Sequence, residues 1–202
     1  MVDYSIENEY REKGFNIICG VDEAGRGPLA GPVYAAAVIL PSDCVIEGLN
    51  DSKKLTEKKR EALFDEIKEK ALAYGIASAD EQEIDEINIV TATFLAMKRA
   101  IASLSVRPDL ALIDGNQKPH TDIEEVTVIK GDAKSMSIAA ASVLAKVSRD
   151  RFMLEMAEKY PQYEFARHKG YGTKLHYEKI AQYGVCDIHR RTFLKKILGE
   201  QK

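Results

Sequence analysis

The stretch "IICGVDEAGRGPLAGPV", residues 17–33, joins the pattern of a buried strand to the pattern of a polar site. Its apolar run at residues 17–21 is typical of a buried strand, and the run ends in two adjacent acids, Asp22 and Glu23. Five of the nine residues after Glu23 are glycine or proline, and Arg26 stands between two of the glycines. Carboxylates are costly at the end of a buried strand, and glycines let the backbone approach a ligand closely. We therefore expect a functional site in this stretch.

The composition is that of a soluble globular protein, with 45% hydrophobic and 30% charged residues. At 202 residues the chain is long enough for one domain, or one domain with a small appendage. No apolar run approaches the ~18–20 residues of a membrane-spanning helix, and the polar, acidic first residues are unlike a signal peptide. The three cysteines are odd in number and lack metal-ligand spacing, which favours a reducing, cytoplasmic location.

Charge is distributed unevenly along the chain. Residues 165–202 carry nine Lys and Arg against three Asp and Glu, whereas the other 164 residues carry 20 basic and 29 acidic groups. A basic tail beside an acidic body suits a protein that meets a polyanion at one end. The same charges would also suit an ordinary solvated helical surface, so charge alone leaves both interpretations open.

Hydrophobic periodicity predicts a mixed α/β protein. The expected elements are strands at 16–23 and 33–40, a helix at 55–75, a strand at 74–80, a helix at 88–104, strands at 109–115 and 125–132, a long helix from about 134, and shorter helices near 174–183 and 189–198. Strands come first, then alternate with helices, and only helices follow. We expect a mixed sheet flanked by helices over residues 1–160, and a small, basic, substrate-contacting helical extension over 161–202.

Two local features sharpen this prediction. Thr56 is the expected N-cap of the first long helix. The run "IAAASVLAKVS" at 138–148 is rich in small residues, which implies tight packing of the long helix against the sheet.

Four acids lie at or near the ends of expected strands: Asp22, Glu23, Asp114 and Asp132. Taken singly, Asp114 fits a "DGN" turn and Asp132 fits a helix cap. Together, like charges repel unless a cation lies between them. A carboxylate cluster without Cys or His favours Mg²⁺ or Mn²⁺, and two such ions ~3.5–4 Å apart can activate water for phosphodiester hydrolysis.

The spacing of the acids imposes two conditions. Neighbouring residues of a regular strand point to opposite faces, so Asp22 and Glu23 can share one site only if the strand bulges or ends there. Asp150 lies 18 residues after Asp132, about 27 Å along a straight helix. Because it is i+4 from Lys146, we expect Asp150 to form an ion pair instead.

The motifs together resemble one known family. "GVDEAGRGPLAGPV" resembles the opening signature of ribonuclease HII, the bacterial type 2 ribonuclease H. The likeness continues through "LNDSKKLT", "LIDGN", "KGDAKSMSIAAASVLAKVSRD", "HKGYGT" and "HRRTF", and so covers nearly the whole chain. It implies a ribonuclease H-like fold with a helical C-terminal part. It also implies a cytoplasmic endonuclease that cuts the RNA strand of RNA–DNA hybrids, including single ribonucleotides in duplex DNA.

The resemblance also implies roles for individual residues. The four metal-binding carboxylates would be Asp22, Glu23, Asp114 and Asp132, holding two Mn²⁺ or Mg²⁺ ions. Glycine-loop backbone groups at Gly25, Arg26 and Gly27 would read the 2′-hydroxyl, which is both donor and acceptor, while Arg26 holds the adjacent phosphate. Tyr171, between two glycines, has little packing of its own and would stack on the sugar beside the ribonucleotide.

Other polar residues near these motifs have both a substrate-binding and a structural interpretation. Candidate phosphate contacts are Lys53 and Lys54, ahead of the first long helix, and His168 and Lys169, before the G-Y-G turn. Ser142, Lys146 and Arg149 either line the groove that binds the hybrid or have a structural role in the long helix. His189, Arg190 and Arg191 would add charge to the duplex-binding surface. None of the four histidines is expected to bind a metal.

Three alternatives stand beside this interpretation. Ribonuclease HIII shares the fold and the acids, but its long N-terminal extension is not present here. A phosphotransferase lacks its G-x-x-x-x-G-K-[ST] motif, and a non-catalytic nucleic-acid-binding module gains nothing from carboxylates that face phosphates. We expect a monomer; a replication clamp is a partner that the family admits and that nothing in the sequence indicates.

Overall fold

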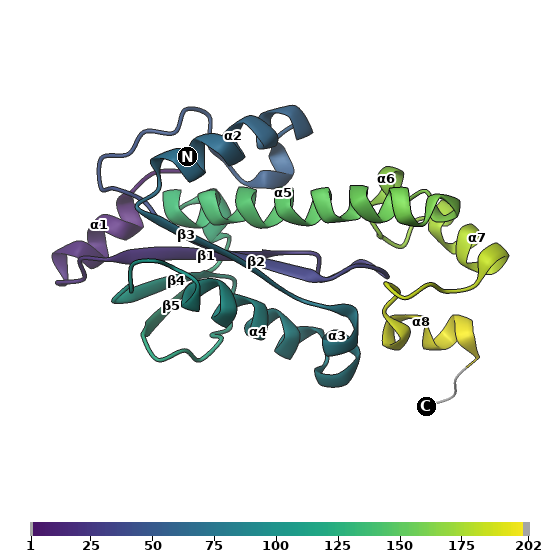
Figure 1. The fold of residues 1–202 in the computed structure, drawn as a ribbon. Helices are drawn as coiled ribbons and strands as arrows, with labels where there is room; N and C mark the ends of the chain where they lie inside the picture. Colours follow the sequence, from purple (N-terminus) through teal and green to yellow (C-terminus); the bar gives the residue numbers. More distant parts are fainter. Residues whose placement is uncertain (1, 200–202) are drawn as a thin grey trace.

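The computed structural model describes residues 2–199, in which a central five-stranded sheet is covered by helices on both faces (Figure 1). The strands are β1 (Ile18–Ala24), β2 (Val33–Ile39), β3 (Ala73–Ala79), β4 (Leu110–Asp114) and β5 (Glu124–Val128). Their order is β3-β2-β1-β4-β5. β1 pairs antiparallel with β2 and parallel with β4, so the sheet is mixed, as predicted.

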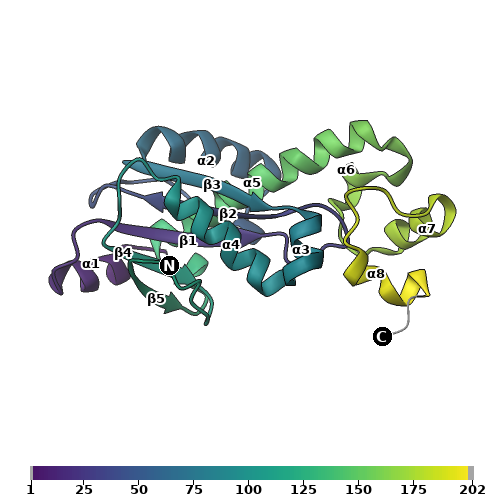
Figure 2. The same ribbon diagram turned by 60° about the horizontal axis from the view of Figure 1, so that its bottom comes forward.

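The helices form two layers and a separate C-terminal group (Figures 1 and 2). They are α1 (Ser5–Glu12), α2 (Glu57–Lys70), α3 (Glu81–Ile87), α4 (Ile89–Ala102), α5 (Met136–Lys159), α6 (Phe165–His168), α7 (Lys174–Tyr183) and α8 (Arg191–Leu198). α2 and α5 cover one face of the sheet, and α3 and α4 cover the other. α6, α7 and α8 lie beyond one end of the sheet. The predicted fold class, including the helical C-terminal extension, is confirmed.

α5 lies very close to the sheet, as its small residues predict. Ala139, Ala140 and Ala141 are fully buried in the core between α5 and the sheet. On the facing strand, a Cβ at Gly20 would collide with the backbone of Ser137. Only glycine therefore permits this distance between β1 and α5, and the contact holds the start of α5 against β1.

Helix boundaries are set by local caps, most of which the sequence reveals. Thr56 caps α2 as predicted, accepting a hydrogen bond from the Lys59 N–H. The prediction omits α3, although Asp80 and Glu83 form a capping box at its start. α5 is capped by Ser135 and not by Asp132, so the simple structural explanation of Asp132 is wrong.

The expected bulge at Asp22–Glu23 is not found, although β1 ends one residue later, at Ala24. β1 pairs with β2 in regular register through Asp22, Glu23 and Ala24. Alternation then places Asp22 on the face that carries Gly20 and α5, and Glu23 on the face covered by α4. The two adjacent acids therefore leave β1 on opposite sides, although both reach the cavity at the end of the strand.

The C-terminal extension is attached to the loop that follows β1. The Leu29 N–H donates to the Gly170 carbonyl at 2.8 Å, and the Gly31 N–H donates to the Ile188 carbonyl at 2.8 Å. Across the molecule, Asp85 in α3 accepts hydrogen bonds from the first backbone N–H groups of α8. In the described part, the chain after α5 forms only helices and irregular segments. A domain boundary at residue 160 stays a prediction.

Two further observations concern membrane-spanning helices and the C-terminal residues. Among residues 2–199, no helix combines the length and hydropathy needed to cross a membrane. Residues 200–202, part of the C-terminus on which a clamp-binding peptide would lie, fall outside the described residues.

Candidate active site

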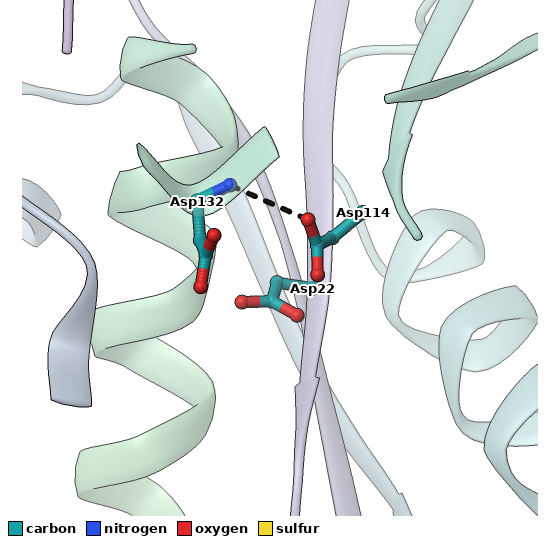
Figure 3. Close-up of side chains that lie close together, drawn as sticks. All are labelled: Asp22, Asp114 and Asp132. Carbon is teal, nitrogen blue, oxygen red and sulfur yellow. Dashed lines mark hydrogen bonds between the residues drawn. The ribbon is translucent and has the colours of Figure 1, made fainter. Parts of the chain in front are cut away.

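Three carboxylates converge at one edge of the sheet (Figure 3). One oxygen from each of Asp22, Asp114 and Asp132 lies within 4.8 Å of the other two. Asp22 belongs to β1 and Asp114 ends the parallel neighbour β4, so the strand ends bring them together. Asp132 comes from a single 3₁₀ turn, Gly131–Ala133, just before α5.

Backbone N–H groups orient the carboxylates. Asp22 Oδ1 accepts from the Glu23 N–H at 2.6 Å. Asp114 Oδ1 accepts from the Gly131 N–H at 2.7 Å and from the Asp132 N–H at 3.4 Å, the bond drawn in Figure 3. Asp114 thus binds the turn that carries Asp132, which ties the two acids to each other across 18 residues of chain.

Electrostatics makes this cluster unfavourable as three bare anions. Burial, reinforced by the charges of Glu23 and Asp114, raises the pKa of Asp22 well above its usual range. Burial and the charge of Asp132 raise the pKa of Asp114. A bound cation would relieve both effects, and carboxylate oxygens are the ligands that hard divalent ions prefer. The residues present therefore fit a divalent metal ion.

Glu23 stands apart from the cluster. Its Oε1 lies 3.5 Å from Arg26 Nη1, and it lines a second cavity of about 100 Å³ on the α4 side with Thr93 and Phe94. Burial raises the pKa of Glu23, Arg26 opposes that rise, and the charge of Asp114 adds to it. The structure brings three of the four predicted acids together; Glu23 as a metal ligand stays a prediction.

A cavity of about 200 Å³ opens over the acids. Its lining combines the acids with the glycine loop, cations, two serines and a tyrosine: Asp22, Glu23, Gly25, Arg26, Ser52, Lys53, Asp114, Ser142, Lys146 and Tyr171. Lys53 Nζ lies 3.4 Å from Asp132 Oδ2, and its side chain is 77% exposed. Arg26 is about half exposed. Both cations can therefore reach a phosphate at the mouth of the cavity.

Tyr171 stands at the rim of this cavity, as its glycine neighbours suggest. It is 42% exposed, and its ring lies 5.8 Å from Lys146 Nζ and 5.5 Å from Arg149 Cζ. Lys146 Nζ also pairs with Asp150 Oδ1 at 2.7 Å, which confirms the ion pair predicted for Asp150. Two cations thus contact the Tyr171 ring, and the side chain stays partly exposed at the cavity.

Several predicted contacts are not where the sequence suggests. His168 is buried, and its ring nitrogens bond the Tyr163 carbonyl and the Gly170 N–H, so it has no free donor for phosphate. His189 and Arg190 are also buried and cannot add charge to a surface. Lys54 and Arg191 are exposed and Lys169 is half-buried, and none of the three lines the cavity.

Comparison with known proteins decides the family. The family model of ribonuclease HII matches residues 19–196. The chain belongs to the ribonuclease HII family. Ribonuclease HII of Caldicellulosiruptor bescii is 57% identical over 196 residues, covering 97% of this chain and 95% of that protein. Ribonuclease HII of Endomicrobium trichonymphae is 59% identical over 191 residues, covering 94% and 91%.

A solved structure agrees with the family. The crystal structure of ribonuclease H2 from Pyrococcus horikoshii OT3 is 28% identical, with a TM-score of 0.76, and covers 92% of this chain and 97% of that one. The resemblance inferred from the motifs is confirmed, and ribonuclease HII is favoured over the ribonuclease HIII alternative. The chain is a nuclease of the ribonuclease H type.

The sequence singles out Ser142, Arg149 and Arg190 but does not indicate what they contact. Ser52 Oγ accepts a 2.7 Å hydrogen bond from Ser142 Oγ beneath the cavity, and Arg149 and Arg190 are buried behind the glycine loop. The partners of Arg190 lie 159 to 165 residues away in sequence, so no local pattern indicates them. An arginine pair in "HRRTF" is therefore indistinguishable in sequence from surface charge.

Proposed function

We propose that this ribonuclease HII cuts the DNA strand that carries a single embedded ribonucleotide, on the 5′ side of that ribonucleotide, as well as the RNA strand of longer hybrids. The products would carry 3′-hydroxyl and 5′-phosphate ends. One observation carries the proposal: Asp22 and Asp114 of the acid cluster, Gly25 and Arg26 of the glycine loop, and Tyr171 line a single cavity. Groups that can take part in the reaction and groups that can contact the sugar thus face the same space.

The acids would hold a pair of divalent ions, Mn²⁺ or Mg²⁺. Asp22, Asp114 and Asp132 supply the core ligands, with Glu23 as the further carboxylate. When bound, such a pair supplies an activated water and stabilises the leaving O3′. The chain's own task is to keep the carboxylates in place, which the backbone N–H bonds to Asp22 and Asp114 do before any metal arrives.

The cations and Tyr171 would position the substrate. Arg26 and Lys53 project to the mouth of the cavity, where each can meet a phosphate oxygen. The exposed part of the Tyr171 ring can stack on the sugar next to the ribonucleotide. Backbone groups of Gly25–Arg26–Gly27 can contact the 2′-hydroxyl, because the two glycines carry no side chain and the exposed Arg26 side chain can turn toward a phosphate.

A phosphotransferase is the less favoured function. In that class, a glycine loop cradles phosphates at a helix N-terminus. Here the loop runs from β1 into β2, which begins at Val33, and no helix starts at its end. The geometry therefore supports inspection of a sugar over binding of a triphosphate.

The test compares three 5′-labelled substrates: a DNA duplex with one ribonucleotide, the same duplex in all-DNA form, and a long RNA–DNA hybrid. With Mg²⁺ or Mn²⁺ we expect one cut 5′ of the ribonucleotide, cleavage of the hybrid, and an intact all-DNA duplex. EDTA should abolish both reactions, and the product should be extendable by a polymerase from its 3′-hydroxyl. An intact one-ribonucleotide duplex, or cleavage that persists in EDTA, would contradict the proposal.

A further inference from the structure

Two arginines, Arg149 and Arg190, lie fully buried behind the glycine loop. Within residues 2–199, neither forms an ion pair with a carboxylate. A buried charge without an ionic partner is expensive, so its hydrogen bonds must compensate. Every hydrogen bond from these two guanidinium groups goes to a backbone carbonyl of residues 25–32.

Arg190 makes the more extensive set of contacts. Its Nη2 donates to the Gly25 carbonyl at 2.6 Å, its Nη1 to the Arg26 carbonyl at 2.9 Å, and its Nε to the Gly31 carbonyl at 2.8 Å. Its backbone N–H adds a bond to the Leu29 carbonyl at 2.9 Å. One residue of the C-terminal extension therefore holds both ends of the loop.

The two bonds to Gly25 and Arg26 determine where the next N–H groups point. The described residues contain no cis peptide bond, and in a trans peptide the C=O and the following N–H point in opposite directions. With both carbonyls turned to the guanidinium, the N–H groups of Arg26 and Gly27 face away from it. Neither N–H donates a hydrogen bond within residues 2–199.

We propose that Arg190 is a positioning residue for ribonucleotide recognition, holding the Arg26 and Gly27 N–H groups as a preset pair of donors for the substrate ribose. The inference rests on the proposed function, because it takes the 2′-hydroxyl as the group recognised. Donors fixed before binding cost no ordering entropy when substrate arrives, which is why a preset loop discriminates better than a mobile one. The C-terminal extension thereby serves the site without lining the acid cluster.

Arg149 completes the support from the α5 side. Its Nε and Nη2 donate to the Pro32 and Ala30 carbonyls at 3.2 Å and 3.1 Å. A Cβ at Gly25 would collide with the Arg149 side chain, and Gly25 has a φ of +98°. The loop is thus confined between two guanidinium groups, and only glycine fits at its first position.

Lysine cannot replace Arg190 in this role. A guanidinium presents separate donors in a rigid planar fork, whereas an ammonium is a single point at the end of a flexible stem. Three carbonyls bonded by three different nitrogens therefore require arginine. Arg190→Lys keeps the charge and most of the volume, and so removes only the planar arrangement of the three donors.

The test measures binding in Ca²⁺, used to allow binding without turnover, by fluorescence polarisation of the one-ribonucleotide duplex and of the matching all-DNA duplex. The Kd for the all-DNA duplex divided by the Kd for the one-ribonucleotide duplex reports recognition of the ribose. We expect Arg190→Lys to lower this ratio by about tenfold, and Arg190→Gln, which leaves no buried charge, to lower it as well. Arg107→Lys, the same change at an exposed arginine, should keep the wild-type ratio.

A second control separates positioning from general stability. Tyr163→Phe removes one hydrogen bond to the Gly184 carbonyl within the same extension, so it should lower the melting temperature and leave the ratio unchanged. If either folded Arg190 variant retains the wild-type ratio, or weakens both duplexes equally, the inference is overturned. If the wild-type protein itself shows no preference for the ribonucleotide duplex, the proposed function fails instead.

Discussion

At Asp22, burial and neighbouring negative charge act on the same carboxylate, and both raise its pKa. A carboxylate whose folded pKa is raised destabilises the fold at neutral pH, because the unfolded chain ionises it more easily. The ionised cluster therefore lowers the stability of the fold at neutral pH unless a cation neutralises it.

This cost predicts a stability effect of Asp22→Asn. Without metal, the variant should unfold at a higher temperature than wild type, since it removes a buried charge. Added Mn²⁺ should raise the melting temperature of wild type by roughly 2–4 °C for each kcal/mol of binding free energy, and that of the variant far less. Calorimetry in EDTA and in Mn²⁺ measures both shifts; equal stabilisation of both proteins by Mn²⁺ would remove Asp22 from the metal site.

The two glycines of the G-R-G motif should behave differently. Gly25→Ala would force a side chain into Arg149 at a positive φ, and we expect it to lower the free energy of unfolding by at least about 2 kcal/mol. Gly27 has open space around it, so Gly27→Ala should stay within about 0.5 kcal/mol of wild type. Urea unfolding of the pair tests this; similar stabilities would show that Arg149 does not confine the loop.

Tyr171 offers a test of stacking. Tyr171→Ala should lower kcat/KM on the one-ribonucleotide duplex by about tenfold, because an aromatic contact is worth on the order of 1 kcal/mol. Tyr171→Phe keeps the ring and should stay within about twofold of wild type. Equal losses in the two variants would assign the role to the hydroxyl, and no loss in either would remove Tyr171 from the substrate.

Local motifs were sufficient to locate the acids and the glycine loop, since each lies in a contiguous stretch with its own turn chemistry. They could not reveal that Glu23 faces α4, because this follows from the unbroken pairing of β1 with β2. They could not reveal Arg190 either, whose bonds span about 160 residues. Long-range contacts of this kind depend on the fold and leave no periodic signal.

Among the elements, the close approach of β1 and α5 is the contact that places Asp132 beside Asp22. Gly20→Ala should disrupt it, since the added carbon meets rigid backbone at Ser137 and neither element can retreat without opening the core. We expect a loss of at least about 2 kcal/mol in the free energy of unfolding, together with weaker Mn²⁺ binding. A stable variant that binds Mn²⁺ normally would show that the spacing is adjustable.

A chain of hydrogen bonds through two histidines, His176 and His189, joins α7 to the segment before α8. The Cys186 N–H donates to His189 Nδ1, which leaves the His189 proton on Nε2, 3.1 Å from His176 Nε2. His176 Nδ1 then donates to the Tyr171 carbonyl at 3.0 Å. Both rings must be neutral for this order of bonds, and burial lowers the pKa of each to about 4.

These two buried neutral histidines predict that acid lowers the stability of the fold. The unfolded histidines titrate near 6.5, so between pH 6.5 and about 4 the unfolded chain binds protons that the folded chain does not. The free energy of unfolding should therefore fall as pH drops through this range. His189→Gln should reduce the slope, and urea titrations at several pH values in EDTA compare the variant with wild type. Identical slopes in the two proteins would contradict the assignment.

For the whole molecule, the order of strands and helices along the chain was enough to predict a mixed sheet with a helical extension. α3 was missed even though Asp80 and Glu83 form a recognisable capping box. The position of the extension was not predictable, because it depends on backbone bonds to the loop after β1 and on Asp85 capping α8. Its contact with that loop is the route by which we propose that the C-terminal helices support recognition.

The central claim is that Asp22, Asp114 and Asp132 act together in cleavage. The most direct measurement is the rate at which wild type and the three single Asp→Asn variants cut the one-ribonucleotide duplex in Mn²⁺. Asp122→Asn, at an exposed acid paired with Arg107, is the matched control. We predict a loss of about a thousandfold or more in each of the three variants and a wild-type rate in the control. A near wild-type rate in any of the three would contradict the account.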